Sequence, residues 1–150
     1  MLSAFACIRE AARRPVRLLV LLCLALAPTA PAQAGVLIGI ENSQQQMHVF
    51  VDGALAYRWP VSTARLGYWT PPGRYRVQRM ERMWYPRKYD WSPMPHSLFF
   101  RGGYAIHGTS SIRQLGRPAS HGCVRLHPGH ARMLFGIVES HGVAQVVVRD

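Results

Sequence analysis

The stretch Ser120–Leu126, with the sequence SHGCVRL, is the part of the chain on which the predicted fold and chemistry depend. It contains Cys123, the only cysteine that remains once the N-terminal segment is set aside. A second short motif, AIHGT, lies upstream at Ala105–Thr109. A lone cysteine in an oxidising compartment is a liability unless it is buried, paired between chains or reactive, so its presence needs an explanation.

The N-terminal segment has the layout of a secretory signal peptide. Four arginines precede an apolar run at Leu18–Ala27, and Ala32–Ala34 forms an A-x-A cleavage site. The run is about half of the ~20 residues that a membrane-spanning helix needs. We therefore expect a signal peptide at residues 1–34 and an exported domain at residues 35–150, without a transmembrane span, in the periplasm or cell envelope. A retained anchor, and twin-arginine rather than Sec export, are the alternatives.

The composition of residues 35–150 favours one basic domain with a single core. Its 14 basic and six acidic residues give a net charge of +8, and Lys88 is its only lysine. Arginine offers a planar fork that suits carboxylates. We expect an anionic partner such as a carboxylate-rich wall polymer or a lipid surface, and no nucleic acid. An arginine-rich soluble surface would account for most of these positions as well.

Hydrophobic periodicity predicts a mainly β domain with one helix. Apolar residues at i, i+3, i+4 and i+7 predict a helix over Pro128–His141, with Gly142 as its stop. Pro60 favours the edge or the end of a strand. The pattern is lost over Glu81–Ser97, which we expect to be a long loop, either a binding loop or a packed surface loop. Strands are predicted at Val36–Ile40, Met47–Val51, Ala54–Val61, Arg74–Gln78, Leu98–Phe100, Gly103–Ile106 and Val143–Arg149.

The residues around the cysteine favour nucleophilic catalysis. A nearby imidazole can take the thiol proton and lower the thiol pKa, and His107 and His121 are the candidates. Gly122 permits a tight turn whose N–H groups could form an oxyanion hole. No acidic residue lies in this region, so the third member of a triad would be a backbone carbonyl, with that of Gly108 the nearest.

Other interpretations of the same residues remain open. A lone cysteine is often a small buried hydrophobe, and a wall-binding module with a degenerate site would need no thiol chemistry. A zinc-dependent hydrolase is a further alternative, because cysteine and histidine are preferred zinc ligands. His127 and His130 flank the expected start of the helix and need not face Cys123. The five residues that would supply such a site are His107, His121, Cys123, His127 and His130.

Together, the two motifs resemble the signature of the L,D-transpeptidase catalytic domain. The resemblance covers roughly Val36–Val148, and it implies a mainly β fold, an L,D-transpeptidase-like β-sandwich or barrel with one helix after the cysteine motif. It also implies acyl transfer on peptidoglycan stem peptides through a cysteine thioester, forming cross-links or exchanging the terminal D-amino acid, without cofactor or metal. Further matching segments are Gln46–Gly53, Val61–Thr63, Thr70–Gly73, Met94–Pro95 and Gly102–His107.

The resemblance also implies roles for individual residues. Cys123 would be the nucleophile and His107 the general base, held by the carbonyl of Gly108. Many relatives have serine instead of that glycine. The N–H groups of residues 121–123 would stabilise the oxyanion. The expected oxyanion and supporting residues are thus His121, Gly122, Gly108 and Ser120.

Arg125 would hold substrate or brace the motif, although many relatives have asparagine there. Tyr104, Trp84 and Trp91 are the expected aromatic contacts of the substrate. The acceptor stays open. Water would make the protein an L,D-carboxypeptidase or hydrolase, and a lipoprotein lysine would make it an anchoring enzyme. The sequence does not address the oligomeric state.

Overall fold

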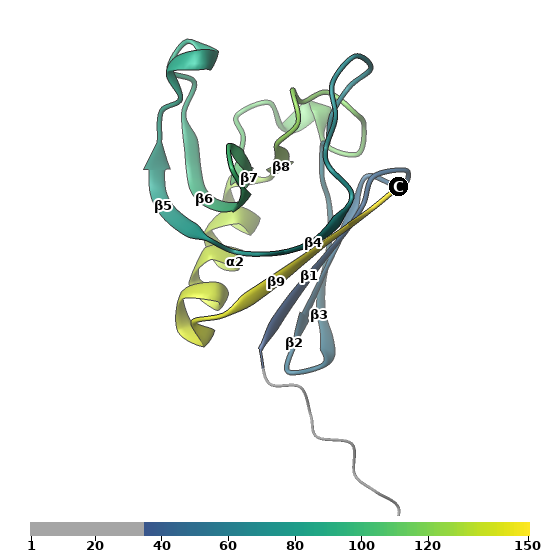
Figure 1. Ribbon diagram of the computed structural model, residues 1–150, viewed down its shortest axis with the longest axis vertical. Coiled ribbons are helices and arrows are strands. Elements are labelled where there is room, and N and C mark those ends of the chain that lie inside the picture. Colours follow the sequence, from purple (N-terminus) through teal and green to yellow (C-terminus); the bar gives the residue numbers. More distant parts are fainter. Residues whose placement is uncertain (1–34) are drawn as a thin grey trace, which may run out of the picture. The chain divides into compact units, whose positions relative to one another are not determined.

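The computed structural model describes residues 35–150, which form two β-sheets and one α-helix (Figure 1). The predicted signal peptide, residues 1–34, lies outside the described residues. The strands are β1 (Val36–Glu41), β2 (Gln46–Val51), β3 (Ala54–Pro60), β4 (Gly73–Arg76), β5 (Arg79–Trp84), β6 (Met94–Arg101), β7 (Tyr104–Gly108), β8 (Val124–Leu126) and β9 (Ala144–Arg149). The helix is α2 (Pro128–His141), and η2 (Arg87–Tyr89) and η3 (Ile112–Gln114) are single 3₁₀ turns.

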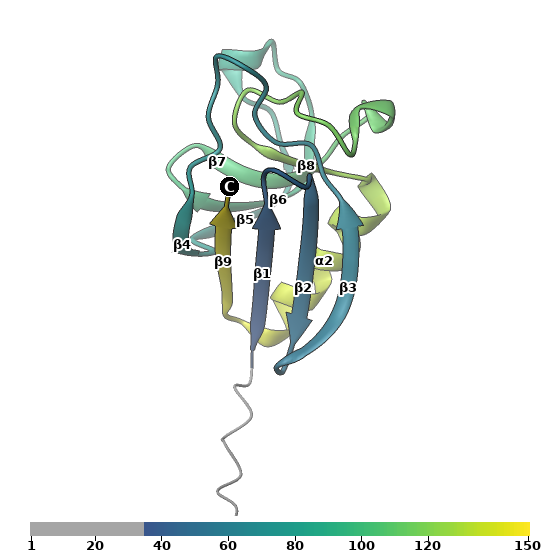
Figure 2. The ribbon, with the colours of Figure 1, turned by 90° about the vertical axis from the view of Figure 1, so that its right-hand side faces the viewer.

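The larger sheet has the strand order β3-β2-β1-β9-β4 (Figure 2). β1 and β9 run parallel, and the other neighbours pair antiparallel. Pro60 ends β3, which is an edge strand, so the missing proline N–H breaks no ladder between strands. The edge position predicted from this proline is confirmed.

The smaller sheet has the order β5-β6-β7-β8, and β7 and β8 run parallel. Successive side chains on a strand point to opposite faces. Ile106 pairs with Val124, and both are fully buried in the core. His107 pairs with Arg125, so these two share the opposite face. Cys123 precedes Arg125 by two residues and therefore belongs to that same face.

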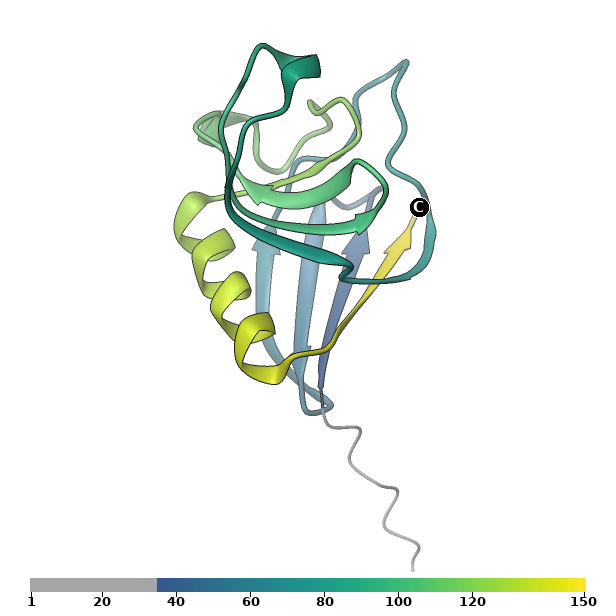
Figure 3. The same cartoon turned by 60° about the vertical axis from the view of Figure 1, so that its left-hand side comes forward.

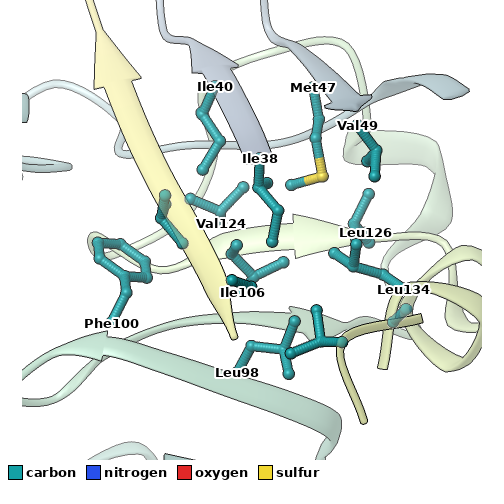
Figure 4. Close-up of a cluster of buried hydrophobic side chains, with 14 of the residues drawn as sticks. Ile38, Ile40, Met47, Val49, Leu98, Phe100, Ile106, Val124, Leu126 and Leu134 are labelled. Carbon is teal, nitrogen blue, oxygen red and sulfur yellow. The ribbon is translucent and has the colours of Figure 1, made fainter. Parts of the chain in front are cut away.

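The core lies between the two sheets and the helix (Figure 4). α2 packs against β6 and β7, beside the smaller sheet (Figure 3). Its buried residues are the four that the periodicity predicts, and its bounds match the predicted helix. The fully buried core side chains include Ile38, Ile40, Met47 and Val49 from the larger sheet, Leu98, Phe100, Ile106, Val124 and Leu126 from the smaller, and Leu134 from α2.

The structure corrects the predicted secondary structure in two places, of which one is β8, a strand that was not predicted. Residues Glu81–Ser97 were expected to form a loop, but β5 extends to Trp84 and β6 begins at Met94. β5 is an edge strand with long, mostly exposed side chains, which hides its alternation. The connection is therefore residues 85–93. The mainly β fold class, with a single helix after the cysteine motif, is confirmed for the described residues.

Candidate active site

The segment that follows β3 holds the cysteine motif in place. Ser62 and Arg125 exchange two backbone hydrogen bonds, with N–O distances of 3.0 and 2.9 Å. The carbonyl of Thr63 accepts from the N–H of Ser120 at 2.9 Å, and the carbonyl of Ser120 accepts from the N–H of Arg65 at 3.0 Å. The motif is thus bonded to this segment on one side and, through β8, to β7 on the other.

The turn before the cysteine requires glycine. Gly122 has a φ of 129°, in a region that residues with side chains rarely adopt. A Cβ atom there would lie 2.8 Å from Cε1 of Tyr104 and 2.9 Å from the backbone oxygen of Trp69. Both distances are below 3.0 Å, a separation that Cβ atoms in proteins essentially never show. The motif therefore packs directly against two aromatic residues from other segments.

Two hydroxyl groups brace the same turn. Thr70 Oγ1 donates to the carbonyl of Gly122 at 2.8 Å and accepts from the N–H of Ala64 at 2.9 Å. Ser120 Oγ accepts from the N–H of Gly122 at 3.0 Å. This bond occupies the Gly122 donor, so the expectation that it also points into an oxyanion hole does not fit the geometry. The other two N–H groups expected in that role are those of His121 and Cys123.

His107 is a buried imidazole with a fixed orientation. Its Nδ1 lies 2.8 Å from the carbonyl oxygen of Gly108, so Nδ1–H donates and Nε2 is left to accept. Burial lowers its pKa to about 4, the Arg125 guanidinium adds to the effect, and the carbonyl contact opposes it. The ring is consequently neutral at neutral pH. A Cβ at Gly108 would lie 3.0 Å from Pro95 Cγ and 3.2 Å from the Cα of Pro128, which favours glycine at this position.

Cys123 is a free, partly exposed cysteine. Its Sγ lies 3.8 Å from the carbonyl oxygen of Gly103. Burial raises the pKa of the thiol, while a backbone hydrogen bond at Ala105 and the charge of Arg125 lower it. The net direction is upward, so the resting side chain is a thiol. The sequence-based expectation of a lowered thiol pKa is wrong in sign for this state.

A cleft with two lobes opens onto Cys123. The polar lobe has a volume of about 600 Å³ and the aromatic lobe about 460 Å³. The residues that line only the polar lobe include His107, Thr109, Ser110, Ser111, Arg125 and Asp90. Those that line only the aromatic lobe include Trp69, Arg79, Trp84, Phe99 and Tyr104. The residues that line both lobes include Tyr68, Lys88, Tyr89, Met94, His121 and Cys123.

His121 links two loops at this cleft. Its ring stacks on Tyr89, with centroids 5.4 Å apart and planes 13° apart, and it contacts Tyr68 at 4.4 Å. The two tyrosines come from the connections 61–72 and 85–93, which lie at the same end of the domain (Figure 1). No sequence motif singles out these two tyrosines. Tyr89 lies in the aromatic-rich segment, but its spacing does not set it apart from its neighbours.

The predicted site residues mostly come together. Cys123, His107, His121, Ser120, Arg125, Tyr104 and Trp84 line the cleft, Gly122 forms its turn, and Gly108 orients the histidine. Trp91 lines neither lobe and instead lies near Arg87, 5.5 Å from ring centroid to guanidinium carbon. Arg125 Nη1 donates to Gln114 Oε1 at 3.0 Å. It therefore braces the neighbouring loop while lining the polar lobe.

The zinc alternative gains no support from the described residues. Within residues 35–150, no group of three or more histidine, cysteine, aspartate or glutamate side chains is placed to hold a metal ion. His127 and His130 lie together at the start of α2, with ring centroids 5.2 Å apart. Neither lines the cleft.

Within residues 35–150, no helix combines the length and apolar character needed to cross a membrane.

Comparison with known proteins identifies the relatives of this chain. The YkuD family, described as the L,D-transpeptidase catalytic domain, matches residues 35–148. No curated protein sequence matches. An L,D-transpeptidase from Mycobacterium smegmatis is 24% identical, with a TM-score of 0.69 over 78% of this chain and 59% of its own. One from Stackebrandtia nassauensis is 25% identical, with a TM-score of 0.69 over 84% of this chain and 60% of its own.

A third solved structure, LdtMt1 in complex with imipenem, is 19% identical, with a TM-score of 0.68 over 76% of this chain and 58% of its own. The matched part thus covers about 60% of each of these proteins, and the likeness extends over both sheets and the helix. The match to residues 35–148 covers most of the chain and both motifs. The chain belongs to the L,D-transpeptidase catalytic domain family.

Proposed function

We propose that the protein is an L,D-transpeptidase that acts on peptidoglycan stem peptides through a thioester on Cys123. The observation that carries the proposal is the placement of Cys123 and His107. Both line the polar lobe: His107 lies on β7, Cys123 directly precedes β8, which pairs with β7, and the carbonyl of Gly108 holds the histidine. Family membership supports this class of reaction. We also propose that residues 1–34 are a signal peptide and that the domain works in the cell envelope.

In the proposed first step, Cys123 Sγ attacks the carbonyl of the third residue, a diamino acid, of a donor tetrapeptide. Nε2 of His107 takes the thiol proton as the C–S bond forms. Because both groups start neutral, proton transfer accompanies the attack. The N–H groups of His121 and Cys123 stabilise the oxyanion. The C–N bond then breaks, and the imidazolium returns its proton to the departing D-alanine amine.

In the second step, an acceptor amine attacks the thioester and His107 takes its surplus proton. The amide bond forms as the C–S bond breaks, and the sulfur regains a proton from the imidazolium. Arg125 and Lys88, which line the polar lobe, supply positive charge for stem-peptide carboxylates. An acceptor of water would give an L,D-carboxypeptidase or hydrolase, and a lipoprotein lysine would give an anchoring enzyme.

Mass spectrometry of the products from a defined tetrapeptide muropeptide tests the proposal. We expect cross-linked dimer, and an exchanged product when a D-amino acid is added. His107→Ala should abolish both products, whereas His48→Ala, on β2 and outside the cleft lining, should not. A trimmed tripeptide as the sole product would identify a carboxypeptidase. Turnover that survives Cys123→Ala and stops in chelator would overturn the cysteine mechanism.

A further inference from the structure

We propose that the aromatic lobe is a saccharide subsite, which binds an N-acetylated amino-sugar ring of the glycan strand while the polar lobe takes the stem peptide. The inference rests on the proposed function, because only a peptidoglycan substrate joins such a sugar to the reacting peptide. It assigns a saccharide ligand to the aromatic lobe, which the proposed acyl-transfer steps do not use.

The walls of the aromatic lobe suit a sugar ring. Trp69 and Trp84 line it while 54% and 37% exposed, so their rings are only partly covered by protein. The C–H bonds on one face of a pyranose carry a slight positive charge, and the face of an aromatic ring is negative. The two surfaces are flat and stack closely. A stem peptide of small side chains offers no comparable flat apolar surface.

Arginines hold both indoles in place. The Arg79 guanidinium carbon lies 4.5 Å from the ring centroid of Trp84 and 3.9 Å from that of Phe99. Glu81 fixes the same guanidinium through an ion pair at 2.7 Å. Arg101 lies 5.4 Å from the ring centroid of Trp69. The lobe therefore presents aromatic rings that arginines contact, together with the guanidinium of Arg79, whose N–H groups can donate to an acetamido carbonyl.

The two lobes together fit one substrate with two chemical parts. The polar lobe is lined by hydroxyl groups and by Arg125, Lys88 and Asp90, which suit a peptide with charged ends. The aromatic lobe, at about 460 Å³, lies within the usual range for small-molecule sites of about 300–1,000 Å³. Both lobes open onto Cys123. A peptide bound at the sulfur could therefore extend to its own sugar in the neighbouring lobe.

Two tryptophans of the same hairpin make a matched pair for the test. Trp84 ends β5 and lines the aromatic lobe. Trp91 lies in the connection that follows, is 56% exposed, and lines neither lobe. Loss of either indole removes the same chemical group from the protein surface. Only loss of Trp84 should affect a ligand in the aromatic lobe.

The experiment measures binding in the full chain with Cys123→Ala, so that the tetrapeptide probes are not turned over, by saturation-transfer NMR and by titration of tryptophan fluorescence. The probes are the N-acetylglucosamine–N-acetylmuramic acid disaccharide, the same disaccharide carrying the tetrapeptide, and the free tetrapeptide. We expect the sugar-bearing tetrapeptide to bind about tenfold tighter than the free one, given the energies of ring stacking. Trp84→Ala should remove most of this preference, and Trp91→Ala should keep it.

Equal affinity for the sugar-bearing and free tetrapeptides would overturn the inference, as would equal losses in the two tryptophan variants. Trp69→Ala is the second variant if Trp84→Ala does not fold, and it should also lose the preference. Displacement of the disaccharide by free tetrapeptide would assign the lobe to peptide instead. Cross-linked product without a sugar preference would leave the transpeptidase intact, whereas sugar binding without product from any muropeptide would overturn the proposed function.

Discussion

The two faces of β7 and β8 differ in what they contact: one faces the core and the other the cleft. On the inner face, Ile106 and Val124 are almost completely buried in the core. On the outer face, one residue along each strand, His107 and Arg125 line the polar lobe. The same short strands therefore close the core and carry the proposed catalytic groups. The lesson is that the precision of the site comes from the packing behind it.

This arrangement makes register decisive. If the pairing of the strands shifted by one residue, the side chains that now line the cleft would face the core, and those that now fill the core would face the cleft. Parallel pairing of His107 with Arg125 sets the register on one side. The backbone bonds between Ser62 and Arg125 set it on the other. Changes on the outer face should thus affect chemistry, and changes on the inner face should affect stability.

The largest loss of acyl transfer is expected from a substitution on the outer face. Cys123→Ala removes the proposed nucleophile and should lower acyl transfer at least about 10³-fold. The substitution loses one partly exposed sulfur, so the free energy of unfolding should change by less than about 1 kcal/mol. A muropeptide assay and urea unfolding measure the two quantities. A carbapenem should also acylate wild-type Cys123, adding one drug mass, and leave the variant unmodified. Retained turnover in the variant would refute the assignment.

The inner face should show the opposite behaviour. Leu126→Ala leaves a cavity at a fully buried position and should lower the free energy of unfolding by about 2–5 kcal/mol. Acylation per folded molecule should stay close to wild type, because the outer residues keep their positions. Urea unfolding and acylation, normalised to the folded fraction, check this separation. A large loss of acylation in a fully folded sample would show that the two faces are not separable.

The buried histidine predicts a dependence of stability on pH. His107 has a folded pKa of about 4, below its ordinary 6.5. Between these values the unfolded chain binds the proton that the folded chain excludes. Stability is therefore full above pH 6.5 and falls as the pH drops through 4, by about 3 kcal/mol at pH 4. Urea unfolding of wild type and His107→Gln at pH 7 and pH 4 measures the difference.

The same neutral pair predicts the pH dependence of the rate. Since the thiol and imidazole start neutral, acylation should be flat from about pH 5 to neutrality and decline as His107 titrates near pH 4. A rate that rises steadily with pH through this window would instead indicate attack by a thiolate that forms beforehand.

A smaller loss of stability and of acylation rate is expected when the Thr70 hydroxyl, which braces the turn at Gly122, is removed. Thr70→Val removes the hydroxyl that bonds the carbonyl of Gly122 and the N–H of Ala64. Buried groups without partners should cost about 1–3 kcal/mol of stability. Acylation should also slow, because the turn holds the N–H of Cys123. Thr70→Ser keeps the hydroxyl and should restore both properties. An unchanged Thr70→Val would show that the brace is dispensable.

Much of this architecture could be predicted from the sequence. The bounds of α2 follow from the spacing of its apolar residues, its proline and its terminal glycine. Most strands follow from alternation. β5 was missed because an edge strand with exposed side chains carries little of that signal, and β8 because it is only three residues long. The two motifs name Cys123 and His107 as candidates. Whether these side chains can act as a nucleophile and a base depends on their residue type, which can be read from the sequence.

The sequence by itself determined the periodicities, the motifs and the family to which they belong. Only the tertiary structure decided that His107 and His121 line the cleft with Cys123, whereas His130 lies at the start of the helix outside it. It also decided that Trp84 lines the cleft and Trp91 does not. The direction of each pKa shift is likewise tertiary. The burial of His107 and Cys123 is produced by neighbours distant in the chain, and their local sequence does not encode it.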